Sequence, residues 1–195
     1  MKKVVFVFLF VYVVFFASIA FTDYLSIDTF DDEVRPNNLG GDYGIWSLDW
    51  DDSTQSCRMY HDRFEKLNDR GASVKIVYDV DSKNKAACGF FTILSGVDLS
   101  EFNRLVFYIK GDEKQGFTES LEVEISNPTE VSRYLVNDIT DKWQRKVIPL
   151  ANFKRISDWS NITKFAIVIE DNNVTKKTGV IYIDDIYFSD SGRAM

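Results

Sequence analysis

The sequence contains few of the residues from which metal centres and catalytic nucleophiles are usually built. Among its 195 residues there are one histidine, His61, and two cysteines, Cys57 and Cys88. One histidine and two widely separated cysteines do not match the ligand spacing of a zinc site. A Ser-His-Asp triad cannot be argued from a single histidine. No glycine-rich phosphate-binding motif occurs either.

Helical periodicity is also missing. Apolar and polar residues instead alternate in five segments, at 73–80, 105–110, 121–126, 165–169 and 180–189. Such alternation is typical of antiparallel strands with one face buried and one solvated. Turn signals such as Lys110-Gly111-Asp112, Asn127-Pro128 and Thr178-Gly179 separate the segments. The sequence therefore predicts an all-β fold, a two-sheet antiparallel β-sandwich (jelly roll), as one domain over residues 23–190.

The amino terminus has the pattern of an export signal. Lys2 and Lys3 precede an apolar run over residues 4–16, and small residues follow at Ser18 and Ala20. This order predicts a signal peptide over residues 1–20 and a secreted, periplasmic or cell-surface protein. The apolar run is also long enough for an uncleaved membrane anchor, which is the alternative.

Acidic residues outnumber basic residues in this sequence. The chain has 23 basic and 30 acidic residues, and loss of the signal would leave 21 basic residues and a net charge of −9. An acidic protein is a poor partner for nucleic acid or for an anionic membrane surface. We therefore expect no nucleic-acid binding, and membrane association only through an uncleaved terminal segment.

The two cysteines have two interpretations. In an oxidising compartment Cys57 and Cys88 could pair and close a loop of about 31 residues, which would be worth roughly 3 kcal/mol. The alternative is two separate buried thiols. We expect the disulfide.

One segment breaks the strand pattern and raises a question. Residues 180–189 read VIYIDDIYFS, in which the pair Asp184-Asp185 interrupts β-branched and aromatic residues. Successive strand residues point to opposite faces, so one carboxylate would share a face with apolar neighbours. Asp184 shares its parity with Ile186 and Phe188 and is expected to point inward.

Four stretches follow one another along the chain: Ile27-Asp28-Thr29-Phe30-Asp31-Asp32, the segment 71–79, the segments 97–112 and 143–150, and the segment 180–189. Taken in this order, they resemble the galactose-binding-domain-like jelly-roll superfamily, which includes many secreted, non-catalytic carbohydrate-binding modules. The chain also resembles a related domain of mitochondrial complex-assembly factors, so a protein-interaction or assembly role is the alternative.

The resemblance implies a structural calcium ion. In similar modules acidic residues of the first and last strands meet near carbonyls of an early loop, and these positions correspond to Asp31, Asp184 and Gly71. Ca²⁺ takes six to eight oxygen ligands, which suits such a set. The alternative is that Asp184 caps a turn or pairs with a lysine.

Candidate sugar-binding residues lie in the glycine- and aspartate-rich region 31–66, which reads as loops. Tyr43, Trp46 and Trp50 are expected to stack on sugar rings, because aromatic side chains among polar loop residues mark interaction surfaces. Alternatively, Trp46 and Trp50 fill one end of the core.

Two glutamates raise a third interpretation. Glu122 and Glu124 fall on one strand face, as in jelly-roll glycosidases, but the third acidic residue of that pattern is absent. Alternating glutamates are usually just the solvated face of a strand. The preferred prediction is a secreted, non-catalytic protein that binds a polysaccharide or oligosaccharide.

Overall fold

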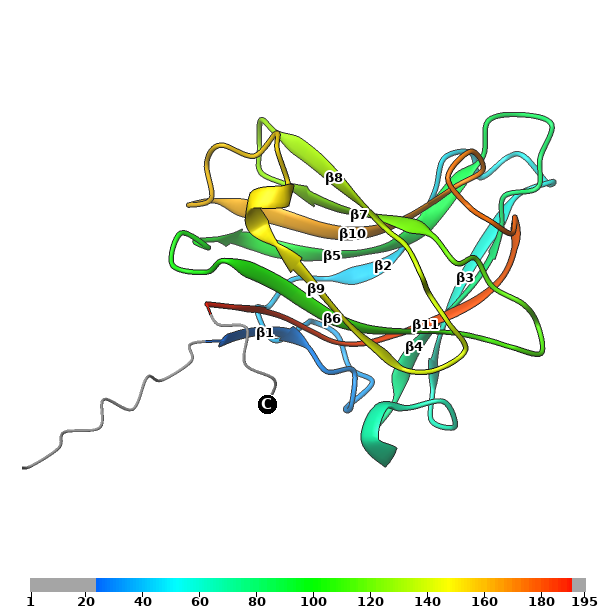
Figure 1. The fold of residues 1–195 in the computed structure, drawn as a ribbon, viewed down its shortest axis with the longest axis horizontal. Helices are drawn as coiled ribbons and strands as arrows, with labels where there is room; N and C mark the ends of the chain where they lie inside the picture. Colours follow the sequence, from blue (N-terminus) through cyan, green and yellow to red (C-terminus); the bar gives the residue numbers. More distant parts are fainter. Residues whose placement is uncertain (1–23, 191–195) are drawn as a thin grey trace, which may run out of the picture.

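The structure is a computed structural model that describes residues 24–190, and it has two antiparallel β-sheets packed face to face (Figure 1). The predicted signal segment, residues 1–20, lies outside the described residues. Within 24–190, no helix has the length and apolar character needed to cross a membrane. The predicted all-β sandwich is confirmed.

The six-stranded sheet has the order β3-β4-β11-β6-β9, and β1 also pairs with β11. The long strand β11 pairs with β4 over its first half and with β1 over its second half, while β6 runs along its other side. The first and last strands of the described chain are therefore neighbours. The strands are β1 (Tyr24–Asp28), β3 (Ser56–Asp62), β4 (Ser73–Asp79), β6 (Arg104–Gly111), β9 (Gln144–Pro149) and β11 (Thr178–Ser189).

The five-stranded sheet has the order β2-β5-β10-β7-β8 and forms the upper layer in Figure 1. Two short 3-10 helices, η1 (Leu67–Asp69) and η2 (Leu150–Asn152), lie in connections. The strands of this sheet are β2 (Tyr43–Ser47), β5 (Ala87–Val97), β7 (Leu121–Ser126), β8 (Val131–Val136) and β10 (Ile162–Glu170).

The core lies between the two sheets and is built from every second residue of their strands. Phe107 of β6 meets Phe165 of β10 across the sandwich, with ring centroids 6.1 Å apart. Both rings are fully buried, and burial of a side chain of this size stabilises a fold by about 1.5–3 kcal/mol. All five segments with predicted alternation are strands, as β4, β6, β7, β10 and β11.

The prediction of loops throughout residues 31–66 is wrong, because β2 and β3 lie within this region. Glycine is depleted in strands, so residues such as Gly44 favour a loop in the sequence. In the structure Gly44 is paired in a ladder opposite Phe91 of β5. A glycine that lies under a neighbouring aromatic ring is compatible with a strand.

The expected disulfide is not formed. Cys57 of β3 and Cys88 of β5 are free, buried thiols. Each thiol donates a hydrogen bond to the backbone carbonyl of a residue next to the other cysteine. Cys57 Sγ lies 3.7 Å from Gly89 O, and Cys88 Sγ lies 3.8 Å from Ser56 O. The hydrogen bond with Cys57 and burial raise the pKa of Cys88. The thiol form is therefore strongly favoured.

Candidate functional site

The outer face of the five-stranded sheet carries two aromatic side chains that lie over glycines. In the β2–β5 ladder Trp46 stands opposite Gly89, and Phe91 stands opposite Gly44. A Cβ atom on Gly89 would lie 3.2 Å from Trp46 Nε1, and one on Gly44 would lie 3.4 Å from Phe91 Cε1. Each ring therefore covers a glycine of the neighbouring strand.

Both rings remain half-buried rather than buried. The indole N–H of Trp46 donates to Ile167 O of β10 at 3.4 Å, which fixes the ring against the sheet. Ala166, opposite Phe91 in the β5–β10 ladder, is another small residue on this face. Small residues beneath and beside the rings leave space above the sheet for a flat ligand.

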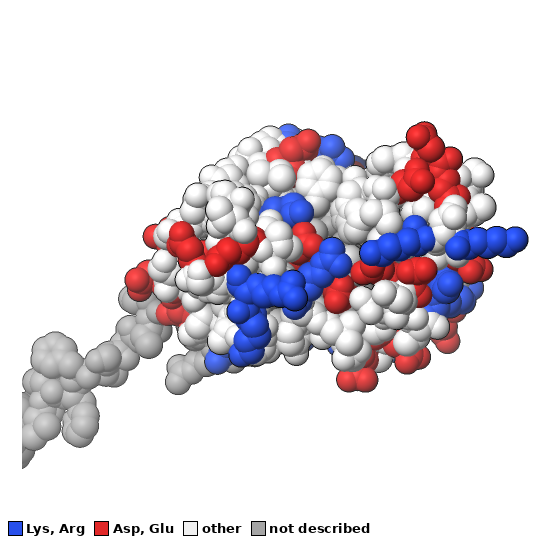
Figure 2. Space-filling model, turned by 90° about the horizontal axis from the view of Figure 1, so that it is seen from above, with Lys and Arg blue, Asp and Glu red and all other residues white. Residues whose placement is uncertain are grey.

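A groove follows from this arrangement. A cavity of about 280 Å³ is lined by Trp46, Phe91, Ala166, Glu124, Arg133 and Lys164. A cavity of about 520 Å³ next to η2 shares Arg133 with it. A cavity of about 90 Å³ beside Leu48 shares both Arg133 and Trp46 with it. We call these three cavities, which share lining residues, the groove. The side of the molecule on which the five-stranded sheet lies is shown in Figure 2.

Arg133 of β8 is the centre of an ion-pair network in the groove. Its Nε lies 2.8 Å from Glu124 Oε2, and its Nη1 lies 3.3 Å from Glu122 Oε2 and 3.4 Å from Glu170 Oε2. Lys164 Nζ lies 2.9 Å from the other oxygen of Glu124. Such fixed charged groups can exchange hydrogen bonds with the hydroxyls of a ligand at little cost in side-chain entropy.

The same network argues against a glycosidase. Burial would raise the pKa of Glu124, but hydrogen bonds from Lys164 and Arg133 outweigh it and hold the pKa below its usual value. A glycosidic general acid needs the opposite, a raised pKa. In this structure Glu122 and Glu124 are ion-pair partners of Arg133.

The three predicted sugar-binding residues have different positions. Trp46 lines the groove. Tyr43 is 1% exposed and belongs to the core, where its hydroxyl lies 2.9 Å from His61 Nε2. The prediction that Tyr43 stacks on a sugar is therefore wrong. Successive strand residues point to opposite faces, so Tyr43 points inward while Trp46 points outward. Trp50 is 63% exposed in the loop between β2 and β3, and it is not among the residues that line the groove.

Sequence reasoning missed Phe91 and Arg133. The pair Phe90-Phe91 held a signal for the first, because adjacent strand residues point to opposite faces: Phe90 is fully buried and Phe91 faces the groove. No sequence signal was available for Arg133, since its partners lie on β7 and on the neighbouring strand β10.

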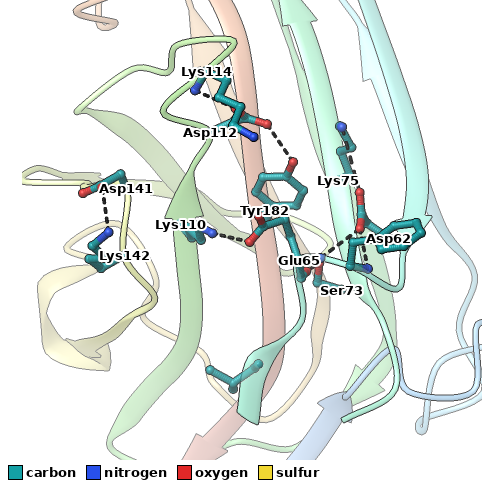
Figure 3. Close-up of polar contacts among 12 residues, drawn as sticks. Asp62, Glu65, Ser73, Lys75, Lys110, Asp112, Lys114, Asp141, Lys142 and Tyr182 are labelled. Carbon is teal, nitrogen blue, oxygen red and sulfur yellow. Dashed lines mark hydrogen bonds and ion pairs between the residues drawn. The ribbon is translucent and has the colours of Figure 1, made fainter. Parts of the chain in front are cut away.

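A second cavity, on the outer face of the six-stranded sheet, lacks an exposed aromatic face. It has a volume of about 220 Å³ and surrounds Tyr182 (Figure 3). The Tyr182 hydroxyl donates to Asp112 Oδ2 at 2.8 Å, and Lys110 pairs with Glu65. The Tyr182 ring itself is buried, with Lys75 Nζ 5.5 Å from its centroid. A sugar could not stack here.

The acidic pair on β11 sits in a β-bulge. Asp184 stands opposite Tyr108 of β6 and Tyr187 stands opposite Val106, so β11 has one residue more than its partner between these pairs. Asp185 has a φ of +43°, which is unusual for a non-glycine residue. The bulge shifts the alternation, so the core residues are Ile181 and Ile183 before it and Ile186 and Phe188 after it.

This bulge corrects the expected orientation of Asp184. Asp184 is the buried member of the pair, at 2% exposure, but it lies on the outer face of the sheet beneath the segment of η1. The N–H of Leu67 donates to its Oδ2 at 3.2 Å, and the N–H of Asp185 donates to its Oδ1 at 2.8 Å. Backbone donors therefore hold the carboxyl group that the sequence left unexplained.

Asp31 and Gly71 lie close to this carboxyl group. A Cβ atom on Gly71, whose φ is +51°, would lie 2.0 Å from Asp31 Oδ1, so only glycine allows this approach. Burial, with Asp185 and Asp31 nearby, raises the pKa of Asp184 to about 8. Arg70 is the cation that pairs with Asp31: its Nη2 lies 3.1 Å from Asp31 Oδ2. The exposed guanidinium of Arg70 therefore pairs directly with Asp31, while the nearby Asp185 and Asp184 act on it only through their charge.

The oxygen atoms around Asp184 and Asp31 supply part of the ligand set that a hard cation needs. Carboxylates from β11 and from the segment after β1, beside the backbone at Gly71, supply the oxygen ligands that Ca²⁺ prefers. Within residues 24–190, however, no group of three or more His, Cys, Asp or Glu side chains is already arranged to hold a metal ion. A bound ion would need backbone carbonyls or water as further ligands.

Comparisons with known proteins agree with this architecture. Two solved structures are family 11 carbohydrate-binding modules from Clostridium thermocellum: that of the cellulosomal cellulase Lic26A-Cel5E has 16% identity, a TM-score of 0.65, and coverage of 88% of this chain and 97% of that chain. The other is in complex with a β-1,3-1,4-mixed-linked tetrasaccharide and has 17% identity, a TM-score of 0.63, and coverage of 85% and 94%.

A third is CBM27-1 of Caldicellulosiruptor saccharolyticus in complex with mannohexaose, with 13% identity, a TM-score of 0.57, and coverage of 88% of this chain and 99% of that chain. At these identities the likeness shows the β-sandwich fold. No curated protein matches the chain. The sequence model of the family described as Carbohydrate binding domain 30 matches residues 40–190, most of the chain. The chain therefore belongs to this carbohydrate-binding family.

Proposed function

We propose that the protein is non-catalytic and binds a polysaccharide chain in the groove of the five-stranded sheet, with Trp46 and Phe91 stacking on successive sugar units. The observation that carries the proposal is the placement of both rings over glycines, where they line the same cavity. The C–H face of a pyranose ring is apolar, so it gains by burial against an aromatic face. The charged groups around Arg133 would form hydrogen bonds with the sugar hydroxyls.

Several observations favour a chain over a single sugar. The groove includes further cavities beside η2 and beside Leu48, which share lining residues with the cavity at the two rings. The similar modules solved with ligands hold a tetrasaccharide and a hexasaccharide. Family membership also favours a carbohydrate ligand over a partner in protein assembly.

A calcium ion at Asp31 and Asp184, with the backbone carbonyl of Gly71 as a further ligand, is part of the proposal. The convergence of these groups, with a raised pKa at Asp184, supports it. When bound, Ca²⁺ would supply only charge compensation and cross-linking, and its binding free energy would add to the stability of the fold. Asp184 would then keep the last strand and the segment after β1 together.

Export completes the proposal. The basic, apolar and small-residue pattern of residues 1–20 supports delivery to the periplasm, the cell surface or the medium. These are compartments in which an insoluble or soluble polysaccharide would be met.

Affinity gel electrophoresis of residues 21–195 in mixed-linkage β-glucan, glucomannan and xylan gels tests the binding. We expect retardation by at least one polymer, and Trp46→Ala and Phe91→Ala should each weaken it by about 2 kcal/mol, or about 30-fold. Tyr60→Ala is the matched control, because Tyr60 is 50% exposed on β3 of the other sheet. Equal loss in all three variants, or no effect of Trp46→Ala, would rule out the groove as the binding site.

A further inference from the structure

The end of the groove beside η2 differs in charge from the rest of the protein. The cavity there, of about 520 Å³, is lined by three basic residues, Arg133, Lys154 and Arg155, and by one acidic residue, Glu122. Glu122 is already paired with Arg133. The chain as a whole carries a net charge of −7, so a basic cavity of this size is not a consequence of composition.

Lys154 and Arg155 supply the uncompensated charge. Both are exposed, and within residues 24–190 neither side chain makes a hydrogen bond or an ion pair. Most other basic side chains around the groove are neutralised: Arg133 by three glutamates, Lys164 by Glu124, and Lys85 by Glu170. On the side seen in Figure 2, lysine and arginine side chains form a cluster between groups of acidic ones.

The backbone fixes the position of these two residues relative to the groove. The N–H of Arg155 donates to Ser132 Oγ at 3.3 Å, and Ser132 is buried next to Arg133 in β8. Phe153, just before them, is 1% exposed and anchors the segment in the core. The two cations therefore project from a rigid support at one end of the groove, rather than from a free loop.

We propose that this end of the groove binds an acidic substituent of the polysaccharide, a sugar carboxylate or a sulfate ester, through Lys154 and Arg155. This inference rests on the proposed function and narrows its substrate class to anionic glycans. A neutral glycan would leave two unpaired cations in the groove. A carboxylate or sulfate would accept charge-assisted hydrogen bonds from the guanidinium fork of Arg155 and from the ammonium group of Lys154.

The test compares matched polymers: glucuronoxylan with its carboxyl-reduced form, a sulfated galactan with its desulfated form, and neutral mixed-linkage β-glucan. We expect one charged form to bind at least about fivefold more tightly than its neutral counterpart, as for one to two exposed ion pairs. The preference should diminish at high ionic strength, because exposed charges are screened beyond about 10 Å at about 0.1 M salt. The arm that responds identifies carboxylate or sulfate.

Lys154→Glu and Arg155→Glu should each remove this preference, and the milder Lys154→Gln and Arg155→Gln should reduce it. Lys114→Glu is the matched control: it changes the net charge equally, but Lys114 lines the cavity around Tyr182 on the other sheet (Figure 3). Thermal unfolding checks that each variant is folded.

The outcomes separate this inference from the proposed function. If charged and neutral polymers bind equally, or if Lys114→Glu acts like the groove variants, the anionic site is refuted. If Trp46→Ala still weakens binding of neutral glucan by about 30-fold in that case, the proposed function stands. If Trp46→Ala has no effect while the Lys154 and Arg155 variants remove binding, the anionic site stands and stacking in the groove is refuted.

Discussion

The buried carboxyl group of Asp184 should make the metal-free protein lose stability as pH rises. Its pKa is about 8 in the folded state, against 3.8 for an ordinary aspartate. The folded state therefore holds a proton that the unfolded state has released, and stability is highest below the unfolded pKa and declines until the pH passes the folded pKa. At about 1.4 kcal/mol per pH unit, the full loss over this window is about 6 kcal/mol.

Between pH 6.5 and about 8, Asp28 and His61 should contribute little to this slope. Burial raises the pKa of Asp28 only to about 6, so its contribution ends lower. Burial also lowers the pKa of His61 from 6.5. This shift makes the folded state more stable as pH rises, which is opposite to the effect of Asp184, and most of the gain is reached by about pH 6.5. Asp185, whose pKa burial and Asp31 raise, acts in the same direction as Asp184.

Urea unfolding of the chelator-treated protein at several pH values measures the slope. We expect the free energy of unfolding to decrease by about 1 kcal/mol per pH unit above pH 6.5 in the parent protein, with a clearly smaller decrease in Asp184→Asn. Asp28→Asn is the control and should keep the slope, since its window lies below. Added Ca²⁺ should flatten the curve of the parent and leave that of Asp184→Asn unchanged.

Parallel curves for the parent and Asp184→Asn would refute the reasoning about the buried proton. A slope that is present but indifferent to Ca²⁺ would leave that reasoning intact and remove calcium from the proposal. The two results are therefore distinguishable in one set of measurements.

Three further predictions concern the groove. Gly89→Ala should destabilise the fold by several kcal/mol or prevent folding, because its Cβ would lie 1.9 Å from a backbone oxygen of β10. Gly44→Ala should cost less than about 1 kcal/mol, because the atom nearest to its Cβ would be 3.4 Å away. Thermal unfolding of the two variants measures the difference. Trp50→Ala should weaken polysaccharide retardation less than threefold, and a loss as large as that of Trp46→Ala would extend the binding site into the β2–β3 loop. Arg133→Met should destabilise by about 3 kcal/mol in urea unfolding, because it leaves buried glutamates without their shared cation; an unchanged midpoint would show that the network adds no stability.

Much of the fold could be predicted from alternation alone. The segments that became β4, β6, β7, β10 and β11 alternate because each has one face on the core, and this local pattern does not depend on the strand's partners. Where glycine interrupts the pattern, as at Gly44, the strand was missed. The stabilising partner of such a glycine is an aromatic side chain on another strand, which no local window contains.

The candidate site was predictable only in fragments. Trp46 was identified as an aromatic residue among polar neighbours, but Tyr43, three residues earlier, was assigned the same role although its ring is buried against Phe30 and Phe90. Once the strand is known, parity separates the two. Phe91 enters the site through the register of β2 with β5, and Arg133 enters through β8.

By itself, the sequence determined the all-β class, the one-sided strands, the acidic balance and the export pattern, because composition and period-two alternation act locally. The tertiary structure decided the rest: the bulge that turns Asp184 outward, the cross-strand pairs that lay Trp46 and Phe91 over glycines, and the connection after β9 that places Lys154 and Arg155 beside Arg133. These features depend on which strands pair and in what register. Strand register is a property of contacts between distant parts of the chain, so a local reading could not supply it.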